Sequence, residues 1–205
     1  MNIFSFLRRR KPIPEPWAKY YTKEELNIKI PDISMYDQVK KSAHLYPEYI
    51  AYEYMGKKCL YKDLLNEINA WAKIFSKSGV KHGDIVSISL PNIPNVLVVL
   101  YALNKIGAIA NMVHPLSSEE EILFSLNSTK SKYLVMLNTF YSKIENIIDN
   151  SKVEAVIFAS ASDYMPFFTK FAYNITQIGK YKNILKTIYF IVGKNFIKSI
   201  IQKNI

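Results

Sequence analysis

The chain has 205 residues, of which 49% are hydrophobic, a composition that suits one globular domain and excludes a disordered chain. Its single cysteine, Cys59, excludes an internal disulfide and a cysteine-rich metal site, and with no signal-peptide pattern it favours the cytoplasm. The net charge of +10 comes from the ends, since residues 1–11 hold four basic residues and residues 164–205 hold seven lysines and no acidic residue. This distribution argues against a nucleic-acid groove built into the fold.

Residues 1–30 are expected to form an arm outside the folded domain. The arm begins with a basic cluster, and Pro12, Pro14 and Pro16 follow it at alternate positions. Because proline cannot continue a helix, this leader is expected to be extended.

A helix is expected to start at Ser34, whose side chain can cap the first turn, and to end before Pro47. Its apolar face should carry Met35, Val39 and Ala43.

A hairpin around a turn at Gly56 is expected next, because short apolar runs flank that glycine. From Leu64 to Phe75 apolar residues then recur at helical spacing. Gly79 stands where a helix-ending residue with positive φ is wanted.

Residues 83–115 form the most informative stretch. Residues 85–90 read as a buried strand, Pro94 can open an apolar helix, and residues 109–113 read as a second strand. Such a strand–helix–strand unit closes right-handed onto a parallel sheet. The apolar run over residues 96–113 is long enough for a membrane span, but polar residues interrupt it, so a buried α/β unit is preferred.

Further elements continue this alternation. A helix is expected from Ser117 or Ser118, with three glutamates in its first turn, followed by a strand over residues 133–137, a helix over 140–149 and a strand over 153–159. The pattern predicts an α/β fold with a doubly wound, mostly parallel sheet and helices on both faces.

The expected organisation is therefore an arm, an α/β domain over residues 31–166 and a lysine-rich helical extension over residues 167–205. In the last segment apolar residues recur at helical spacing between Ile184 and Ile201.

Five short motifs occur in this domain in a definite order. They are a Leu-Tyr pair, a Gly-Asp strand entry, a Leu-Pro-Asn loop, a Lys-x-Gly turn and a His-Pro strand end. The positions concerned are Tyr61, Gly83, Asp84, Pro91, Asn92, Lys105, Gly107, His114 and Pro115. In this order and spacing they resemble the N-terminal portion of the AMP-forming adenylating enzymes, which include acyl-CoA synthetases, luciferase-like ligases and the adenylation domains of peptide synthetases. Two departures are Leu60, where that family usually has Thr or Ser, and Asp63, where it usually has Glu.

The resemblance implies that a complete family member uses ATP, Mg²⁺ and CoA. Such an enzyme needs a glycine-rich loop for the phosphates, acids for Mg²⁺ and a catalytic lysine. The six glycines of this chain form no G-x-G pattern, and the other motifs are also missing. The chain is therefore expected to be a fragment cut short before the phosphate loop. No catalytic, cofactor-binding or metal-binding residue is predicted within it.

Other polar candidates favour structural roles. His114 has no Ser, Cys or acid placed to act with it, and His44 and His82 lie at a helix end and a turn. Cys59 is expected to pack within a strand, and Asp163 in a loop after a strand is the most open case. The acid and amide of the Gly-Asp and Leu-Pro-Asn motifs suit turn chemistry.

Two hypotheses of different classes follow. The first is an acyl-CoA synthetase-like ligase that activates a carboxylic acid, with a fatty acid favoured, and transfers it to CoA; an adenylation module that loads a carrier protein is the alternative within this class. The second is a non-catalytic interaction module whose incomplete sheet exposes an apolar edge and self-associates. In either case the missing C-terminal part is the expected partner.

Both ends of the chain combine apolar and basic residues. Phe4, Phe6 and Leu7 precede the cluster Arg8 to Lys11, and the lysines of residues 164–205 lie among isoleucines and phenylalanines. Two interpretations stay open: a peripheral contact with an anionic membrane surface, or basic residues that are solvated or pair with acids of the missing C-terminal part.

Overall fold

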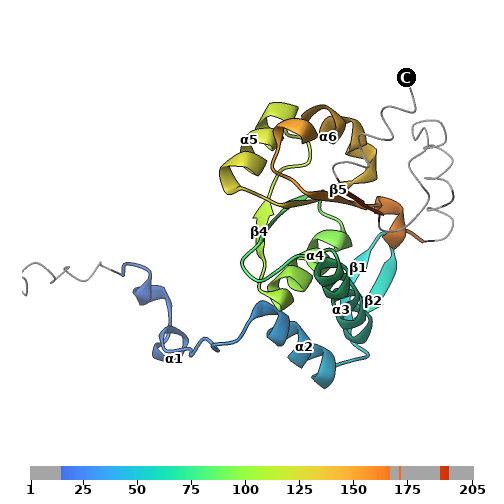
Figure 1. The fold of residues 1–205 in the computed structure, drawn as a ribbon. Coiled ribbons are helices and arrows are strands. Elements are labelled where there is room, and N and C mark those ends of the chain that lie inside the picture. The colour runs from blue at the N-terminus through green and yellow to red at the C-terminus, as the bar shows by residue number, and fades with distance from the viewer. Residues whose placement is uncertain (1–14, 167–170, 172–189, 194–205) are drawn as a thin grey trace, which may run out of the picture. The chain divides into compact units, whose positions relative to one another are not determined.

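The computed structural model describes residues 15–166, Phe171 and Phe190–Gly193. The chain divides into two compact units, Met1–Ile33 and Ser34–Ile205 (Figure 1).

The described part of the arm, residues 15–30, contains two short helical elements beyond its proline-spaced leader. After its last proline it forms a single turn of 3₁₀ helix, η2 (Ala18–Tyr20), and the helix α1 (Lys23–Leu26). A reciprocal capping box starts α1: the Thr22 hydroxyl accepts from the Glu25 N–H at 3.2 Å, and the Glu25 carboxylate accepts from the Thr22 N–H at 2.7 Å. The T-x-x-E signal for this helix was present in the sequence and was overlooked. Residues 1–14 lie outside the described ranges.

The second unit alternates helices and strands from its start. Its elements are α2 (Met35–Leu45), β1 (Ile50–Tyr54), β2 (Lys57–Leu60), α3 (Tyr61–Lys77), β3 (Ile85–Ser89), α4 (Pro94–Ile106), β4 (Ile109–Met112), α5 (Glu119–Thr129), β5 (Tyr133–Leu137), η3 (Asn138–Phe140), α6 (Tyr141–Ile147), η4 (Ile148–Asn150), β6 (Ala155–Ala159), η5 (Ala161–Tyr164) and β7 (Phe190–Gly193). Most bounds lie within two residues of the predicted ones, whereas α3 begins three residues earlier.

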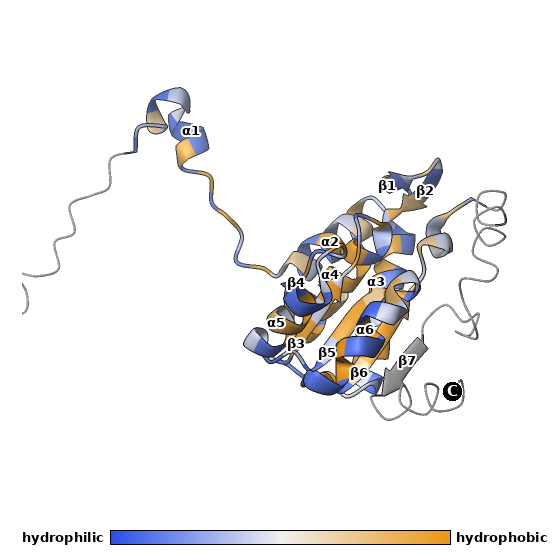
Figure 2. Cartoon of the chain, turned by 90° about the horizontal axis from the view of Figure 1, so that it is seen from above, coloured by the Kyte–Doolittle hydropathy of each residue, from blue (hydrophilic) through white to orange (hydrophobic). Residues whose placement is uncertain are grey.

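The predicted α/β fold class is confirmed. The main sheet has the strand order β4-β3-β5-β6-β7, and its first four strands are parallel. The residues Ile88, Val135 and Ile157 mark the register, since they lie opposite one another on β3, β5 and β6. The hairpin β1-β2 forms a separate antiparallel pair. Hydrophobic residues concentrate on the central strands (Figure 2).

Helices cover both faces of this sheet and form two apolar cores. The helices α3 and α4 pack on one face, where Ile68, Phe75 and Val98 are fully buried. The helices α5 and α6 pack on the other face around Leu126 and Ile144. Burying one such side chain stabilises the fold by roughly 1.5–3 kcal/mol.

The apolar run over residues 96–113 is split between two elements rather than forming one span. Gly107 ends α4 with φ +72°, and β4 begins two residues later. Among the described residues no helix has the length and hydropathy needed to cross a membrane.

The face of α2 differs from the prediction at one position. Ala43 is buried and Val39 packs on the core as expected, but Met35 is exposed and Tyr36 packs in its place.

The helical extension predicted over residues 167–205 is wrong at four positions. Phe190–Gly193 forms β7, which pairs antiparallel with β6 so that Val192 lies opposite Val156. The β-branched pair Ile191-Val192 before a glycine favours a strand. The rest of this segment, apart from Phe171, falls outside the described residues.

Candidate functional site

The nine motif positions do not form one cluster. Gly83, Asp84 and Gly107 lie at the amino ends of strands, and Tyr61 and Lys105 lie on helices. The other four follow the carboxyl ends of strands: Pro91, Asn92, His114 and Pro115. In open parallel sheets ligands bind at the carboxyl ends, at the point where the strand order reverses. That point lies here between β3 and β5, because β4 follows on one side of β3 and β5 on the other.

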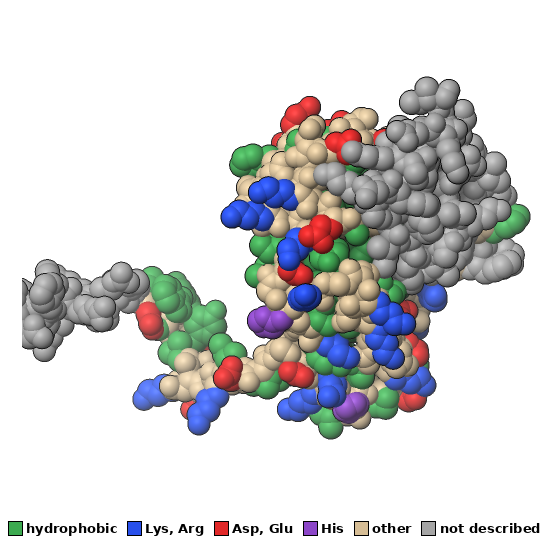
Figure 3. Space-filling model, in the orientation of Figure 1, with side chains coloured by type: hydrophobic (Ala, Val, Ile, Leu, Met, Phe, Trp, Pro, Cys, Tyr) green, Lys and Arg blue, Asp and Glu red, His purple; other side chains and the backbone are tan. Residues whose placement is uncertain are grey.

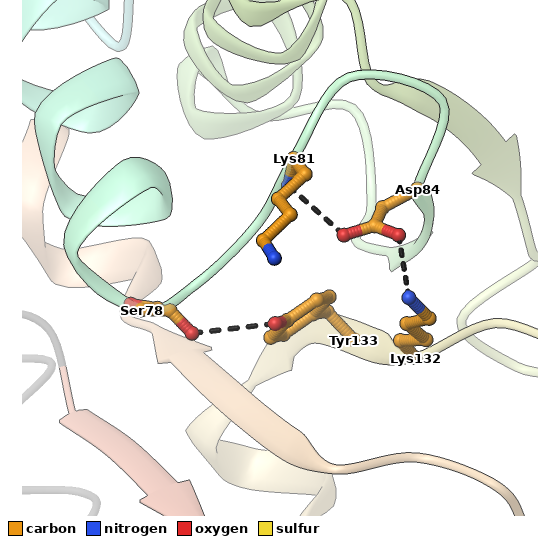
Figure 4. A network of polar contacts seen from close by, with 5 residues as sticks. All are labelled: Ser78, Lys81, Asp84, Lys132 and Tyr133. Carbon is orange, nitrogen blue, oxygen red and sulfur yellow. Dashed lines mark hydrogen bonds and ion pairs between the residues drawn. The ribbon is translucent and has the colours of Figure 1, made fainter.

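Asp84 joins two loops at the amino end of the sheet (Figure 4). Its carboxylate accepts from the Lys81 N–H at 2.9 Å and pairs with the Lys132 ammonium at 2.7 Å. The bond to Lys132 and then the Lys81 amide lower the pKa of the Asp84 carboxyl, and the same pairing raises the pKa of Lys132. Beside them the Tyr133 hydroxyl donates to the Ser78 carbonyl at 3.3 Å. The network connects the turns before β3 and β5, at the end opposite the expected ligand crevice.

Gly107 is required by its conformation and by its neighbour. A Cβ at this position would lie 2.2 Å from Cδ2 of His82, in addition to the strain of φ +72°. Its carbonyl accepts from the Gly83 N–H at 2.8 Å, and the Ile109 N–H donates to the Asp84 carbonyl at 2.8 Å. These motif residues therefore hold the entries of β3 and β4 together.

Lys105 belongs to a polar cluster that joins α2, α3 and α4. Its ammonium donates to Asn69 Oδ1 and lies 4.8 Å from the Tyr36 ring centroid. The Tyr36 hydroxyl donates to the same oxygen at 3.0 Å, and the Tyr36 N–H donates to Asn104 Oδ1 at 2.9 Å. This cluster was not predicted from the sequence, because its members are up to 69 positions apart and no local pattern connects them.

Tyr61 is the first residue of α3, and its N–H donates to the Tyr49 carbonyl at 3.0 Å. The preceding Leu60 has the extended conformation of an N-cap residue but makes no side-chain capping bond.

The loops that follow β3 and β4 hold no nucleophile and base within hydrogen-bond distance of each other. The His114 ring accepts from the Leu116 N–H at 3.3 Å, and its side chain is exposed. After β3 the Ile93 N–H donates to the Pro91 carbonyl at 2.7 Å, which leaves Asn92 exposed at the loop tip.

Three polar side chains near the carboxyl ends of β3 and β5 were not identified from the sequence: the buried Ser89 and Asn95, and the half-buried Asn138. Ser89 ends β3, Asn95 lies in the first turn of α4 and Asn138 follows β5. The Ser89 hydroxyl, both amide atoms of Asn95 and the Asn138 oxygen make no hydrogen bond within the described part of the chain. A buried polar atom without a partner costs about 1–3 kcal/mol, so these atoms mark the region as a candidate site.

The loop after β6 is tied to α3. Ser160 caps η5, and the hydroxyl of the buried Tyr164 donates to a Glu67 carboxylate oxygen at 3.0 Å. Burial raises the pKa of Glu67, which the Tyr164 hydrogen bond opposes. Asp163 lies within this turn.

A cavity of about 390 Å³ lies between the β1-β2 hairpin, α3 and η5. Its lining holds lysines, acids and tyrosines: Tyr52, Tyr54, Lys57, Lys58, Cys59, Asp63, Asn66, Glu67 and Tyr164. Burial raises the pKa of the Cys59 thiol, which keeps it protonated at neutral pH and unsuited to nucleophilic attack.

The described residues do not fit the phosphates or Mg²⁺ of ATP. No group of three or more His, Cys, Asp or Glu in the described ranges could hold a metal ion. The positive-φ glycines among them (Gly56, Gly79, Gly83 and Gly107) lie singly in turns and at a helix end rather than in one phosphate-binding loop.

Comparisons with known proteins agree on one family. The family model described as AMP-binding enzyme matches residues 39–174, more than half of the chain. A long-chain-fatty-acid–CoA ligase of Bacillus subtilis (strain 168) is 26% identical over 164 residues, which are 80% of this chain and 29% of that protein. An acetyl-coenzyme A synthetase of Bartonella bacilliformis is 28% identical over 70% of this chain and 21% of its own length. The chain thus spans less than a third of either relative.

A solved structure shares the fold. A long-chain-fatty-acid–CoA ligase from Archaeoglobus fulgidus superposes with a TM-score of 0.60 at 20% identity, over 67% of this chain and 30% of that one.

Proposed function

The chain belongs to the AMP-binding enzyme family, and from this premise we propose that it is the N-terminal part of an AMP-forming acid–CoA ligase. The whole enzyme would activate a carboxylic acid, preferably a fatty acid, as acyl-AMP and transfer the acyl group to CoA. The observation that carries this proposal is the match over residues 39–174 together with relatives named as long-chain-fatty-acid–CoA ligases. Family membership implies that the complete enzyme uses ATP.

We assign a structural role within the enzyme to this chain. The contacts of Asp84, Gly107 and Lys105 support the proposal that the motif positions hold strand entries and helices together. The phosphate loop, the Mg²⁺ ligands and the catalytic lysine would come from the remainder of the enzyme, which is therefore the main partner of this chain.

The carboxyl ends of β3 and β5 are where the two parts would meet. The unsatisfied polar atoms of Ser89, Asn95 and Asn138 support this assignment, since groups from elsewhere in the enzyme could bind them. The position agrees with the switch point of the sheet.

The test compares the protein made from the complete reading frame with the 205-residue chain. Each is incubated with ATP, Mg²⁺, CoA and acids from acetate to long-chain fatty acids, and acyl-CoA is measured by mass spectrometry. We expect long-chain acyl-CoA from the complete protein and none from the 205-residue chain. Turnover by the short chain would contradict the proposal.

The two alternatives give different outcomes in the same experiment. An adenylation module would form acyl-AMP and load a carrier protein without making acyl-CoA. A non-catalytic interaction module would give neither product from the complete reading frame, and a gene without a glycine-rich phosphate loop beyond codon 205 would agree with that result.

A further inference from the structure

One face of the β1-β2 hairpin lines the cavity of about 390 Å³ beside α3 (Figure 1). Tyr52 lies opposite Cys59, and Tyr54 lies opposite Lys57. Because directly opposed residues of an antiparallel pair share a face, these four side chains all turn toward the cavity. Its volume is in the range of cavities that bind small molecules. None of the four residues belongs to the region at the carboxyl ends of β3 and β5.

The helix α3 and the turn η5 supply the facing wall of the cavity. Asp63 and Glu67 are four residues apart on α3, so they lie on one face of the helix. Glu67 is half-buried and accepts a hydrogen bond at 3.0 Å from the hydroxyl of the buried Tyr164, whereas Asp63 is exposed. Glu67 therefore marks the floor of the cavity, and Asp63 marks its rim.

Four charged side chains line this cavity without pairing with one another: Lys57, Lys58, Asp63 and Glu67. None of them forms an ion pair within the described part of the chain. Burial raises the pKa of the Glu67 carboxyl, as expected for a carboxylate without a bound cation, although the Tyr164 hydrogen bond and Lys57 oppose this shift. Figure 3 shows basic and acidic side chains interspersed over this part of the surface. These charges are therefore available to a ligand.

The two signs of charge select among ligands. A molecule with only a positive charge would be attracted by the two acids but repelled by Lys57 and Lys58, and an anion would meet the reverse. A molecule that carries both charges can pair each of them with its opposite. Aromatic rings also attract organic ammonium groups, and three tyrosines line the cavity.

We propose that this cavity binds a small zwitterion, a molecule with an organic ammonium group and an anionic group. The ammonium group pairs with Glu67 at the floor, and the anionic group pairs with Lys57 and Lys58 at the rim. The proposal goes beyond the ligase function and does not depend on it, because it concerns binding to the 205-residue chain alone.

Three compounds of nearly the same size separate the two charges. δ-Aminovalerate carries both groups, pentylamine carries only the ammonium group, and valerate carries only the carboxylate. Each compound is titrated into the isotope-labelled 205-residue chain, and the backbone amide shifts are followed by NMR. We expect δ-aminovalerate to give saturable shifts at the amides of β1, β2 and the first turns of α3, and to bind about tenfold more tightly than either of the other compounds.

Glu67→Gln tests the ammonium end of the site. Glutamine has nearly the same size and can still accept the Tyr164 hydrogen bond, so the variant should stay folded and bind δ-aminovalerate about tenfold more weakly. The matched control is Glu145→Gln, which removes another half-buried carboxylate, on α6, and should leave binding unchanged. Thermal unfolding followed by circular dichroism checks that both variants are folded.

Replacement of Lys57 and Lys58 by Gln tests the anionic end. The double variant should bind δ-aminovalerate about fivefold more weakly and should bind pentylamine more tightly than the parent chain does, because the repulsion of the ammonium group is removed. Pentylamine should then become the preferred compound, an inversion that a merely structural role of the lysines would not produce. The control changes Lys40 and Lys41, two exposed lysines of α2, to Gln and should keep the preference of the parent chain.

Three results would overturn the proposal. They are the absence of saturable shifts with δ-aminovalerate, equal binding of the three compounds, and binding that neither the Glu67 variant nor the double lysine variant changes.

Discussion

At the scale of single residues, two of the motif positions make contacts that hold strand entries in place. Gly107 combines a positive φ with the close approach of His82, and Asp84 accepts hydrogen bonds from two loops. Both lie at the amino end of the sheet, away from the crevice where ligands bind in this architecture.

Replacement of Gly107 by Ala should destabilise the fold more than a comparable change elsewhere. We expect a loss of about 2–4 kcal/mol in the free energy of unfolding, from the strained φ and from the contact with His82. Gly56→Ala is the control, since Gly56 has φ +80° but no atom within 4 Å of the added Cβ, and should cost only about 1 kcal/mol. Urea denaturation measures both. Equal losses would show that the contact with His82 contributes nothing.

The Asp84 ion pair should make stability depend on pH. Because its pKa is lowered in the folded state, Asp84 contributes stability above its unfolded-state pKa of about 4 and loses it as the pH falls through the folded-state value. Asp84→Asn should therefore cost about 1–3 kcal/mol at pH 7, and this difference from the parent should shrink below about pH 4. A difference that stays constant from pH 7 to pH 3 would argue against a charged role. Lys132→Met should cost less than Asp84→Asn, since the Lys132 side chain is half exposed and solvent screens its charge.

At the scale of elements, the helix α3 has no side-chain hydrogen bond at its N-cap. Leu60 has φ −84° and ψ 158°, the extended conformation of an N-cap residue, but no oxygen to accept from the first turn. This is the position where Leu60 departs from the usual Thr or Ser of the family.

Introducing a hydroxyl there should stabilise the chain. We expect Leu60→Thr to exceed Leu60→Val by about 1 kcal/mol, because the two side chains have the same shape and only Thr can accept from the Asp63 N–H. Thermal unfolding followed by circular dichroism gives the comparison. If both variants unfold at the same temperature, the N-terminus of α3 is already satisfied by other contacts.

Most elements with local sequence signals were predicted correctly, and an element that depends on long-range pairing was not. Strands such as β5 and the helix after Ser118 were predicted because apolar runs and caps are local signals. The strand β7 was not, because its pairing with β6 joins positions more than 30 residues apart and overrides a helical spacing.

The candidate site was harder to predict than the fold for the same reason. Ser89, Asn95 and Asn138 have no motif in common. Only the order of strands in the sheet brings them together near the carboxyl ends of β3 and β5. The bond between Glu67 and Tyr164 spans 97 positions and has no counterpart in any local pattern. By contrast, the order of the motifs between residues 61 and 115 was sufficient to indicate the family.

At the scale of the whole molecule, two apolar cores lie on the two faces of one sheet, and under the proposed function the groups that carry the chemistry would come from the remainder of the ligase. The described residues hold neither a phosphate loop nor a metal site, and the chain covers 29% of the Bacillus subtilis ligase. We therefore expect this chain to fold without catalysing the adenylation step.

Fatty-acid-dependent exchange of labelled pyrophosphate into ATP tests most directly whether the 205-residue chain lacks adenylation activity. The exchange reports formation of acyl-AMP and needs no CoA. The protein of the complete reading frame should catalyse exchange that requires a fatty acid and Mg²⁺, and the 205-residue chain at the same concentration should give none. Fatty-acid-dependent exchange by the 205-residue chain, or its absence from the protein of the complete reading frame, would contradict the account.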